Sequence, residues 1–314
     1  MNERPVLYAQ TASDLREDIS KIGISLCLYT PLCSIVASLF VSIYSSLTSG
    51  GAEDFIKSDF YFAYSFMVSV LPILSCIILL SFLFKRRFSL YSLKPTLPKK
   101  DFSLYTLLGF TALPIGSAVS LLTINLMLEN NLHISSVTVP QNVTSAVFFV
   151  LAHCVAAPIF EELIFRGLIL ERLRHYGDIF AIIVSAFLFA IIHASFQAIP
   201  FAFVSGIIFG FLAIRTGSLL CPLIIHFTNN ILSAVSLFLE EAGFENQFNF
   251  IILCFYALII AVAIIIVLIK KGALCLKFEK GILKASRKFS IFASSFPILI
   301  FFIMSIWLAV SALG

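Results

Sequence analysis

The stretch Glu161-Glu162-Leu163-Ile164-Phe165-Arg166 is the starting point for predicting the fold of this chain. It lies within an apolar run, 146–170, that is long enough to cross a membrane as one helix. An ionisable side chain at membrane depth costs about 2.5–3.5 kcal/mol on insertion scales. Three such side chains in one helix therefore need partners or a function, and the other helices must supply them.

The composition makes the lipid bilayer the solvent of this protein. Hydrophobic residues make up 60% of the 314 residues, charged residues make up 12%, and the mean hydropathy is +1.04. A soluble domain carries about 25% charged residues. We therefore predict an all-α fold, a polytopic transmembrane helical bundle of about eight or nine spans. The net charge of +4 is small and lies in loops, so we expect no nucleic acid partner.

Nine apolar runs have the length of membrane-spanning helices. The fifth and sixth runs are joined by a tight link that contains Pro200, so they could form a re-entrant pair instead of two full crossings. We place the nine runs at about 22–47, 60–84, 102–128, 146–170, 179–196, 201–214, 219–239, 248–269 and 291–313.

Basic residues follow the even-numbered runs, as the positive-inside rule requires of cytoplasmic loops. We predict an integral, multi-pass protein of a bacterial plasma membrane, with a cytoplasmic N-terminus and no cleavable signal peptide. The seven cysteines form no CxxC pair, so neither a disulfide framework nor a thiolate metal site is expected. The basic residues concerned are Lys85, Arg86, Arg87, Lys94, Lys99, Lys100, Arg172, Arg174, Arg215, Lys270, Lys271, Lys277, Lys280, Lys284, Arg287 and Lys288.

Helix geometry separates the polar residues of the first motif. Glu162 and Arg166 are four residues apart and share one helix face, so we expect them to pair. Glu161 is rotated by about 100° from Glu162 and is left as a free carboxylate. His226 and Asn230, four apart in the seventh run, also project from one face.

The free carboxylate and the two histidines are predicted to lie at similar depths in the membrane. At about 1.5 Å per residue, Glu161 lies about 16 Å deep counted from Arg172, and His226 lies at a similar depth counted from Arg215. Counted from Asp178, His193 lies about 22 Å deep. Helix tilt could close the difference. We expect these residues to meet in an intramembrane cavity that opens to the cytoplasm.

This set of side chains suits hydrolysis. A carboxylate can take a proton from water while a histidine orients that water, and a histidine and an amide can stabilise an oxyanion. Glu161, His193 and His226 could instead hold a divalent metal such as Zn, although the one-helix HExxH motif is absent. The alternatives are a purely structural pairing of polar groups and a proton-coupled transporter.

Three motifs resemble those of the CPBP family of intramembrane proteases, which are related to type II CAAX prenyl endopeptidases and to bacteriocin-processing and immunity proteins. The resemblance covers about 144–235 and implies an endopeptidase that hydrolyses a membrane-associated peptide or protein. A prenylated substrate is implied only if a CAAX substrate exists. The motifs are Glu161-Glu162-x-x-x-Arg166, Phe189-x-x-x-His193 and His226-x-x-x-Asn230.

The resemblance also implies a role for each motif residue. Glu161 is expected to be the catalytic base, and His193 to help activate the water. His226 and Asn230 are expected to stabilise the oxyanion, and Glu162 with Arg166 to hold the site in shape. Because the family is described both as metalloproteases and as metal-free glutamate proteases, the choice stays open. A non-enzymatic immunity or scaffold protein of the same fold remains the alternative function.

The predicted chain has three parts. Residues 1–143 form an N-terminal cytoplasmic segment and three transmembrane helices. Residues 144–240 form the catalytic core, and residues 241–314 form the C-terminal transmembrane helices with a basic cytoplasmic loop. Gly206 and Gly210 form a GxxxG pair, which indicates a close helix crossing.

Overall fold

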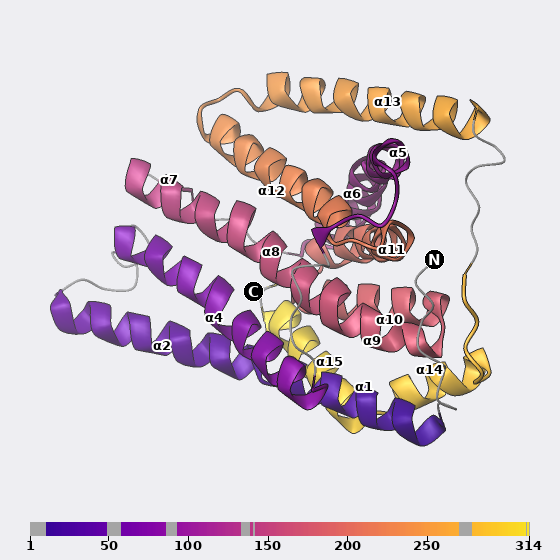
Figure 1. Ribbon diagram of the computed structural model, residues 1–314. Helices are drawn as coiled ribbons and strands as arrows, with labels where there is room; N and C mark the ends of the chain where they lie inside the picture. Colours follow the sequence, from indigo (N-terminus) through magenta and orange to yellow (C-terminus); the bar gives the residue numbers. More distant parts are fainter. Residues whose placement is uncertain are drawn as a thin grey trace.

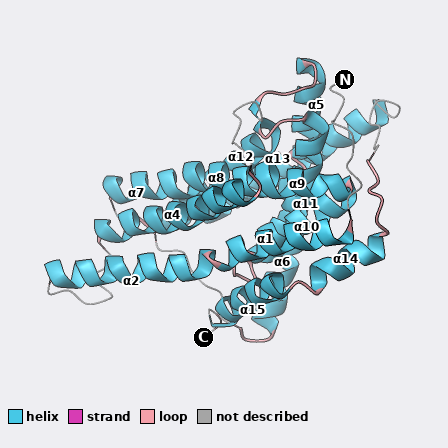
Figure 2. Cartoon of the chain, turned by 60° about the horizontal axis from the view of Figure 1, so that its bottom comes forward, coloured by secondary structure: helices cyan, strands magenta, loops and turns pink. Residues whose placement is uncertain are grey.

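The fold is a bundle of α-helices (Figure 1). The computed structural model describes residues 11–48, 58–85, 93–132, 139–140, 142–269, 278–311 and 313. These ranges contain helices, turns and loops but no strand (Figure 2). His133, Cys275 and the basic residues 86–87, 270–271 and 277 lie outside them.

The described helices follow one another in chain order. Each is named here with the bounds that the structure gives it. They are α1 (Ala12–Cys27), α2 (Tyr29–Leu47), α4 (Asp59–Leu83), α5 (Lys99–Gly109), α6 (Ala112–Glu129), α7 (Val143–Phe149), η2 (Val150–Ala156), α8 (Ala157–Glu162), η3 (Leu163–Leu170), α9 (Glu171–Leu173), η4 (Arg174–Tyr176), α10 (Asp178–Ile191), α11 (Ala198–Thr216), α12 (Leu220–Glu241), α13 (Glu245–Ile269), α14 (Ala285–Ala293) and α15 (Phe296–Ser311).

The predicted polytopic bundle is confirmed, with a smaller number of spans. Among the described residues, seven helices are long and apolar enough to cross a membrane. The number rises to eight if α14 and α15, bent by 62° at their junction, together make one span. We predicted a single run at 291–313, and the structure places this bend within it.

The fifth predicted run differs most from the structure. Helix α10 ends at Ile191 and has 14 residues, which is short for a full crossing. The chain then turns through Ala194, whose φ of 47° lies in the left-handed region. The sixth run starts earlier than predicted, at Ala198, because Pro200 falls in the first turn of α11, where proline is tolerated. The two helices form a hairpin.

Helix α10 lies at the centre of the main hydrophobic core. Eleven of its 14 residues are buried, and the three that are not, Ile179, Ile183 and Phe187, share one face, which explains why its sequence is mostly apolar. The core residues around it come from α1, η3 and α15, with Leu15, Phe165 and Phe301 fully or almost fully buried. The helix that precedes His193 is therefore held from several directions.

A polar cluster ties both ends of the chain to the end of the motif-bearing helix. Buried Asp18 on α1 accepts hydrogen bonds from Arg172 Nε at 2.8 Å and from Tyr176 Oη at 2.7 Å. Lys288 on α14 donates to the carbonyl of Tyr176 at 2.8 Å. Because these bonds fix where η3 and α9 end, they also fix the register of the motif residues one to three turns earlier.

The GxxxG pair of α11 lies at the crossing with α10. Its two glycines should differ in how well they tolerate replacement by alanine. A Cβ added at Gly206 would lie 3.0 Å from the Cα and Cβ of Ala186, whereas one at Gly210 would lie 3.5 Å from Ile182 side-chain carbons. We expect Gly206→Ala to lower the free energy of unfolding by about 1–3 kcal/mol through overpacking. Gly210→Ala is the matched control and should unfold like wild type. Thermal unfolding of both variants in detergent measures the difference, and equal stability of the two would contradict a tight crossing at Gly206.

Candidate active site

Two π-helical segments flank the glutamate motif. In the continuous span 143–176, the short α-helix α8 lies between the π-helical segments η2 and η3. Glu161 and Glu162 are the last two residues of α8. In an α-helix every fourth residue drifts around the axis, and the wider π turns offset that drift. Phe149, His153, Ala157 and Glu161, each four residues from the next, consequently line one cavity.

The predicted pair of Glu162 and Arg166 is present and buried. Arg166 Nη1 donates to Glu162 Oε1 at 2.9 Å, and both side chains are at most 1% exposed. Arg166 Nη2 also donates to the carbonyl of Gly206 at 3.4 Å. Its guanidinium carbon lies 4.3 Å from the ring centre of Phe189 and 5.4 Å from that of Phe209, within cation–π range.

His226 lies next to both adjacent carboxylates and is hydrogen-bonded to one of them, Glu162. Its Nδ1 lies 3.0 Å from Glu162 Oε1, and its Nε2 lies 3.6 Å from Glu161 Oε2. Glu162 Oε1 already accepts a hydrogen bond from Arg166 Nη1, so we assign Nδ1 as the donor to the same oxygen. Glu162 thus holds both Arg166 and His226, a link between distant helices that the i,i+4 rule could not reveal.

Glu161 is the free carboxylate of the site, as its helix position predicts. Its side chain is 18% exposed and lines a cavity of about 750 Å³. Its Oε2 is buried and has no hydrogen-bond partner among the described residues, since His226 Nε2 is too distant at 3.6 Å. The exposed part of the Glu161 side chain lines the cavity, where the carboxylate is available to water or to a ligand.

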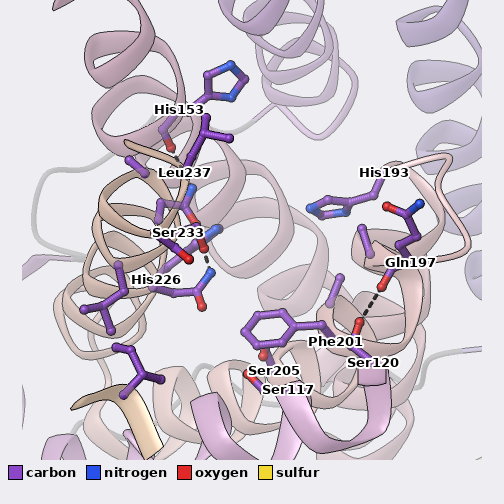
Figure 3. A pocket seen from close by; sticks show the side chains of 18 of the residues that line it. Ser117, Ser120, His153, His193, Gln197, Phe201, Ser205, His226, Ser233 and Leu237 are labelled. Atoms are coloured by element: carbon purple, nitrogen blue, oxygen red, sulfur yellow. Dashed lines mark hydrogen bonds between the residues drawn. The ribbon is translucent and has the colours of Figure 1, made fainter. Parts of the chain in front are cut away.

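His193 and Asn230 face the same cavity from opposite sides. Figure 3 shows His193 and Gln197 on one side of the cavity and His153, His226 and Ser233 on the other. His193 Nδ1 lies 2.7 Å from the carbonyl of Phe189, which can only accept, so Nδ1 donates and Nε2 is left for the cavity. Asn230 Nδ2 donates to the carbonyl of His153 at 2.6 Å, which uses one of its two amide protons.

The segment that carries these side chains matches a known protein family. Residues 143–232 match the family model "Type II CAAX prenyl endopeptidase Rce1-like". This segment is similar to an Rce1-like domain. Searches of curated proteins and of solved structures gave no significant match. The Rce1-like segment runs from the start of α7 into α12, so it contains all six predicted site residues.

The membrane-protease class follows from the match together with the apolar helices. An Rce1-like domain within a helical bundle of seven or eight candidate spans supports an integral, multi-pass membrane protein with a peptide substrate. The resemblance noted in the sequence is confirmed for this segment. Residues 1–142 and 233–314 lie outside the match, and the division into three parts stays a prediction.

The residues of the Rce1-like domain do not converge as a metal-binding set. Within the described ranges, no group of three His, Cys, Asp or Glu side chains is placed to hold a metal ion. Glu161 and His226 approach each other, but His193 contributes from the opposite wall, where it bonds Phe189. We therefore derive no step of the reaction through a metal.

Sequence reasoning missed three polar contributors to the Rce1-like cavity. The carbonyl of His153 accepts a hydrogen bond from Asn230, and the residue also lines the cavity because η2 shifts its register. Asn229 Nδ2 donates to Asn230 Oδ1 at 3.1 Å and orients that amide. Ser205 is 1% exposed, lines the cavity and has no hydrogen-bond partner for Oγ among the described residues. No spacing rule marks a single serine in an apolar helix.

Proposed function

We propose that this protein is an intramembrane endopeptidase that hydrolyses a peptide bond in a membrane-associated peptide or protein. One observation carries the proposal: a cavity-facing carboxylate, Glu161, lies beside His226, which a buried Glu162–Arg166 pair holds in place. Arg166 pairs with Glu162 and offsets its charge, so Glu161 is the carboxylate that is left to react with water. The Rce1-like match supports this reaction class.

The reaction needs a base, an orienting group and an oxyanion stabiliser. Glu161 takes a proton from water, and the water oxygen attacks the carbonyl carbon of the substrate. His193 Nε2 accepts a hydrogen bond from the same water because its Nδ1 is committed to Phe189. The C–N bond then breaks, and the proton held by Glu161 passes to the leaving amine.

The oxyanion formed by that attack is stabilised from α12. Asn230 retains one amide proton beyond the one that binds the carbonyl of His153. When His226 is protonated at both nitrogens, its Nε2 adds a second donor beside Glu161. In a site shielded from water such donors are worth more than in solution, and removing one typically costs 10²–10³-fold in rate.

A metal requirement tests this mechanism directly. We expect a chelator to leave cleavage by the purified protein unchanged, because Glu161 and the histidines act here on water and not through an ion. Elemental analysis of the same preparation should show no stoichiometric Zn. One metal ion per chain, lost together with activity on chelation and dependent on His193 and His226, would contradict the metal-free mechanism.

The experiment that tests the function is a comparison of membrane proteomes. Cells with wild-type protein, with Glu161→Gln and with Glu241→Gln are compared for polypeptides that differ in length. We expect one or more uncleaved precursors to accumulate with Glu161→Gln alone, and their sequence will show whether the substrate is a prenylated CAAX protein. Identical proteomes at equal expression would favour the alternative, a non-enzymatic immunity or scaffold protein.

A further inference from the structure

The cavity occupies only one half of the bundle. Its lining comes from the middle of α6, residues 149–161 of the span 143–176, the C-terminal end of α10 and residues 198–209 of α11. It also comes from α12 beyond His226 and from the beginning of α13. The ends of α7 and α12 that lie nearest these pieces in the sequence, Val143 and Glu241, point to the left of Figure 1.

The two ends of the bundle differ in charge. The end where α9 and α14 meet carries the basic residues of the described loops, among them Arg172, Arg174, Lys280 and Lys284, and we call it the basic end. The opposite end, where α12 passes into α13, carries Glu240, Glu241 and Glu245 and no Lys or Arg in 240–247. We call it the acidic end.

The cavity is closed toward the basic end and open toward the acidic end. Phe209 and Ser205 are 1% exposed and His226 is 6% exposed, so the lining nearest the basic end is a buried floor. Glu240 and Asn249, which line the cavity at the acidic end, are exposed. This arrangement contradicts our expectation of an opening toward the basic loops, which depended on depth alone.

A row of polar side chains on α12 leads from the exposed end to the catalytic groups. The row follows helical spacing and runs for about 21 Å along the axis, the length of about six extended residues. Its hydroxyl and amide groups can bind the free N–H and C=O groups of an extended peptide. No Lys or Arg occurs among the described lining residues. The row consists of His226, Asn229, Asn230, Ser233, Ser236 and Glu240.

We propose that the site is loaded from the acidic end of the bundle by an extended peptide segment that lies along this row of α12. By the positive-inside rule, the basic end faces the cytoplasm and the acidic end faces away from it. The substrate is then the non-cytoplasmic part of a membrane-associated polypeptide, with neutral or basic side chains near Glu240. The identity of the ligand as a peptide rests on the proposed function, whereas the direction of access does not.

Thiol labelling in intact cells tests the direction of access. Ser233→Cys and Ser236→Cys place thiols in the cavity, Glu240→Cys places one at its mouth, and Lys284→Cys places one at the exposed basic end. A membrane-impermeant maleimide is added before or after permeabilisation, and labelling above that of the unsubstituted full-length chain is measured. The unsubstituted chain accounts for the native cysteines.

The proposal predicts a clear split between these variants. The three cavity variants should label in intact cells to the level reached after permeabilisation, and Lys284→Cys should label only after permeabilisation. Labelling of both Ser233→Cys and Ser236→Cys only after permeabilisation would overturn the proposal, as would labelling of Lys284→Cys in intact cells. The readout needs no enzymatic activity, so its failure would leave the proposed peptidase intact, and an inactive wild type would leave the direction of access intact.

Discussion

Replacing Glu161 by glutamine should abolish peptide cleavage while the protein folds normally. Glutamine keeps the shape of the side chain but cannot take a proton from water, and loss of a general base typically costs 10²–10⁴-fold in rate. Stability should be unchanged because Glu161 Oε2 binds no group among the described residues. The measurement is the cleavage rate of the purified variant in detergent, with thermal unfolding as the control for folding.

Glu241→Gln provides the matched comparison for that result. Glu241 is exposed, lies outside the cavity lining and undergoes the same chemical change. It should retain the wild-type rate. If Glu161→Gln cleaved as fast as Glu241→Gln, Glu161 would not be the base, and the proposed mechanism would be wrong.

Removal of Arg166 should have the largest effect on stability. Arg166→Leu leaves Glu162 buried and charged, with only His226 beside it, and breaking a buried ion pair in this way typically costs about 3–5 kcal/mol. The loss should be visible as a lower unfolding temperature in detergent. Arg287→Leu, at an exposed position of α14, is the control and should change little.

A double variant separates the cost of an unpaired charge from a loss of packing. Glu162→Gln combined with Arg166→Met removes both charges and keeps similar volumes, so its destabilisation should be smaller than the sum of the single effects. A double variant whose destabilisation equals that sum would indicate that the two residues act independently, in contradiction to the 2.9 Å pair.

Apolar length was enough to predict most of the bundle. The seventh run, expected at 219–239, is α12 at Leu220–Glu241, and the eighth, expected at 248–269, is α13 at Glu245–Ile269. The exceptions are places where the chain turns without losing apolar character. The pattern does not mark the end of α10 at Ile191, and the bend between α14 and α15 follows a short Ser294-Ser295 link within an apolar run.

The site was predictable within single helices and less so between them. The i,i+4 rule identified the Glu162–Arg166 pair because both residues share one helix. It could not show that His226 bonds Glu162, or that the η2 segment turns His153 toward the cavity. Those contacts depend on helix register and on π-helical geometry, neither of which leaves a periodic signal in the sequence.

The measurement that tests the central claim most directly uses the precursor found by the proteome comparison. That precursor is incubated with purified protein, and mass spectrometry identifies any new termini. We predict a single new pair of termini with wild type and with Glu241→Gln, and an intact precursor with Glu161→Gln. A precursor that stays intact with wild-type protein, or that is cut equally by Glu161→Gln, would contradict a peptidase in which Glu161 activates the water.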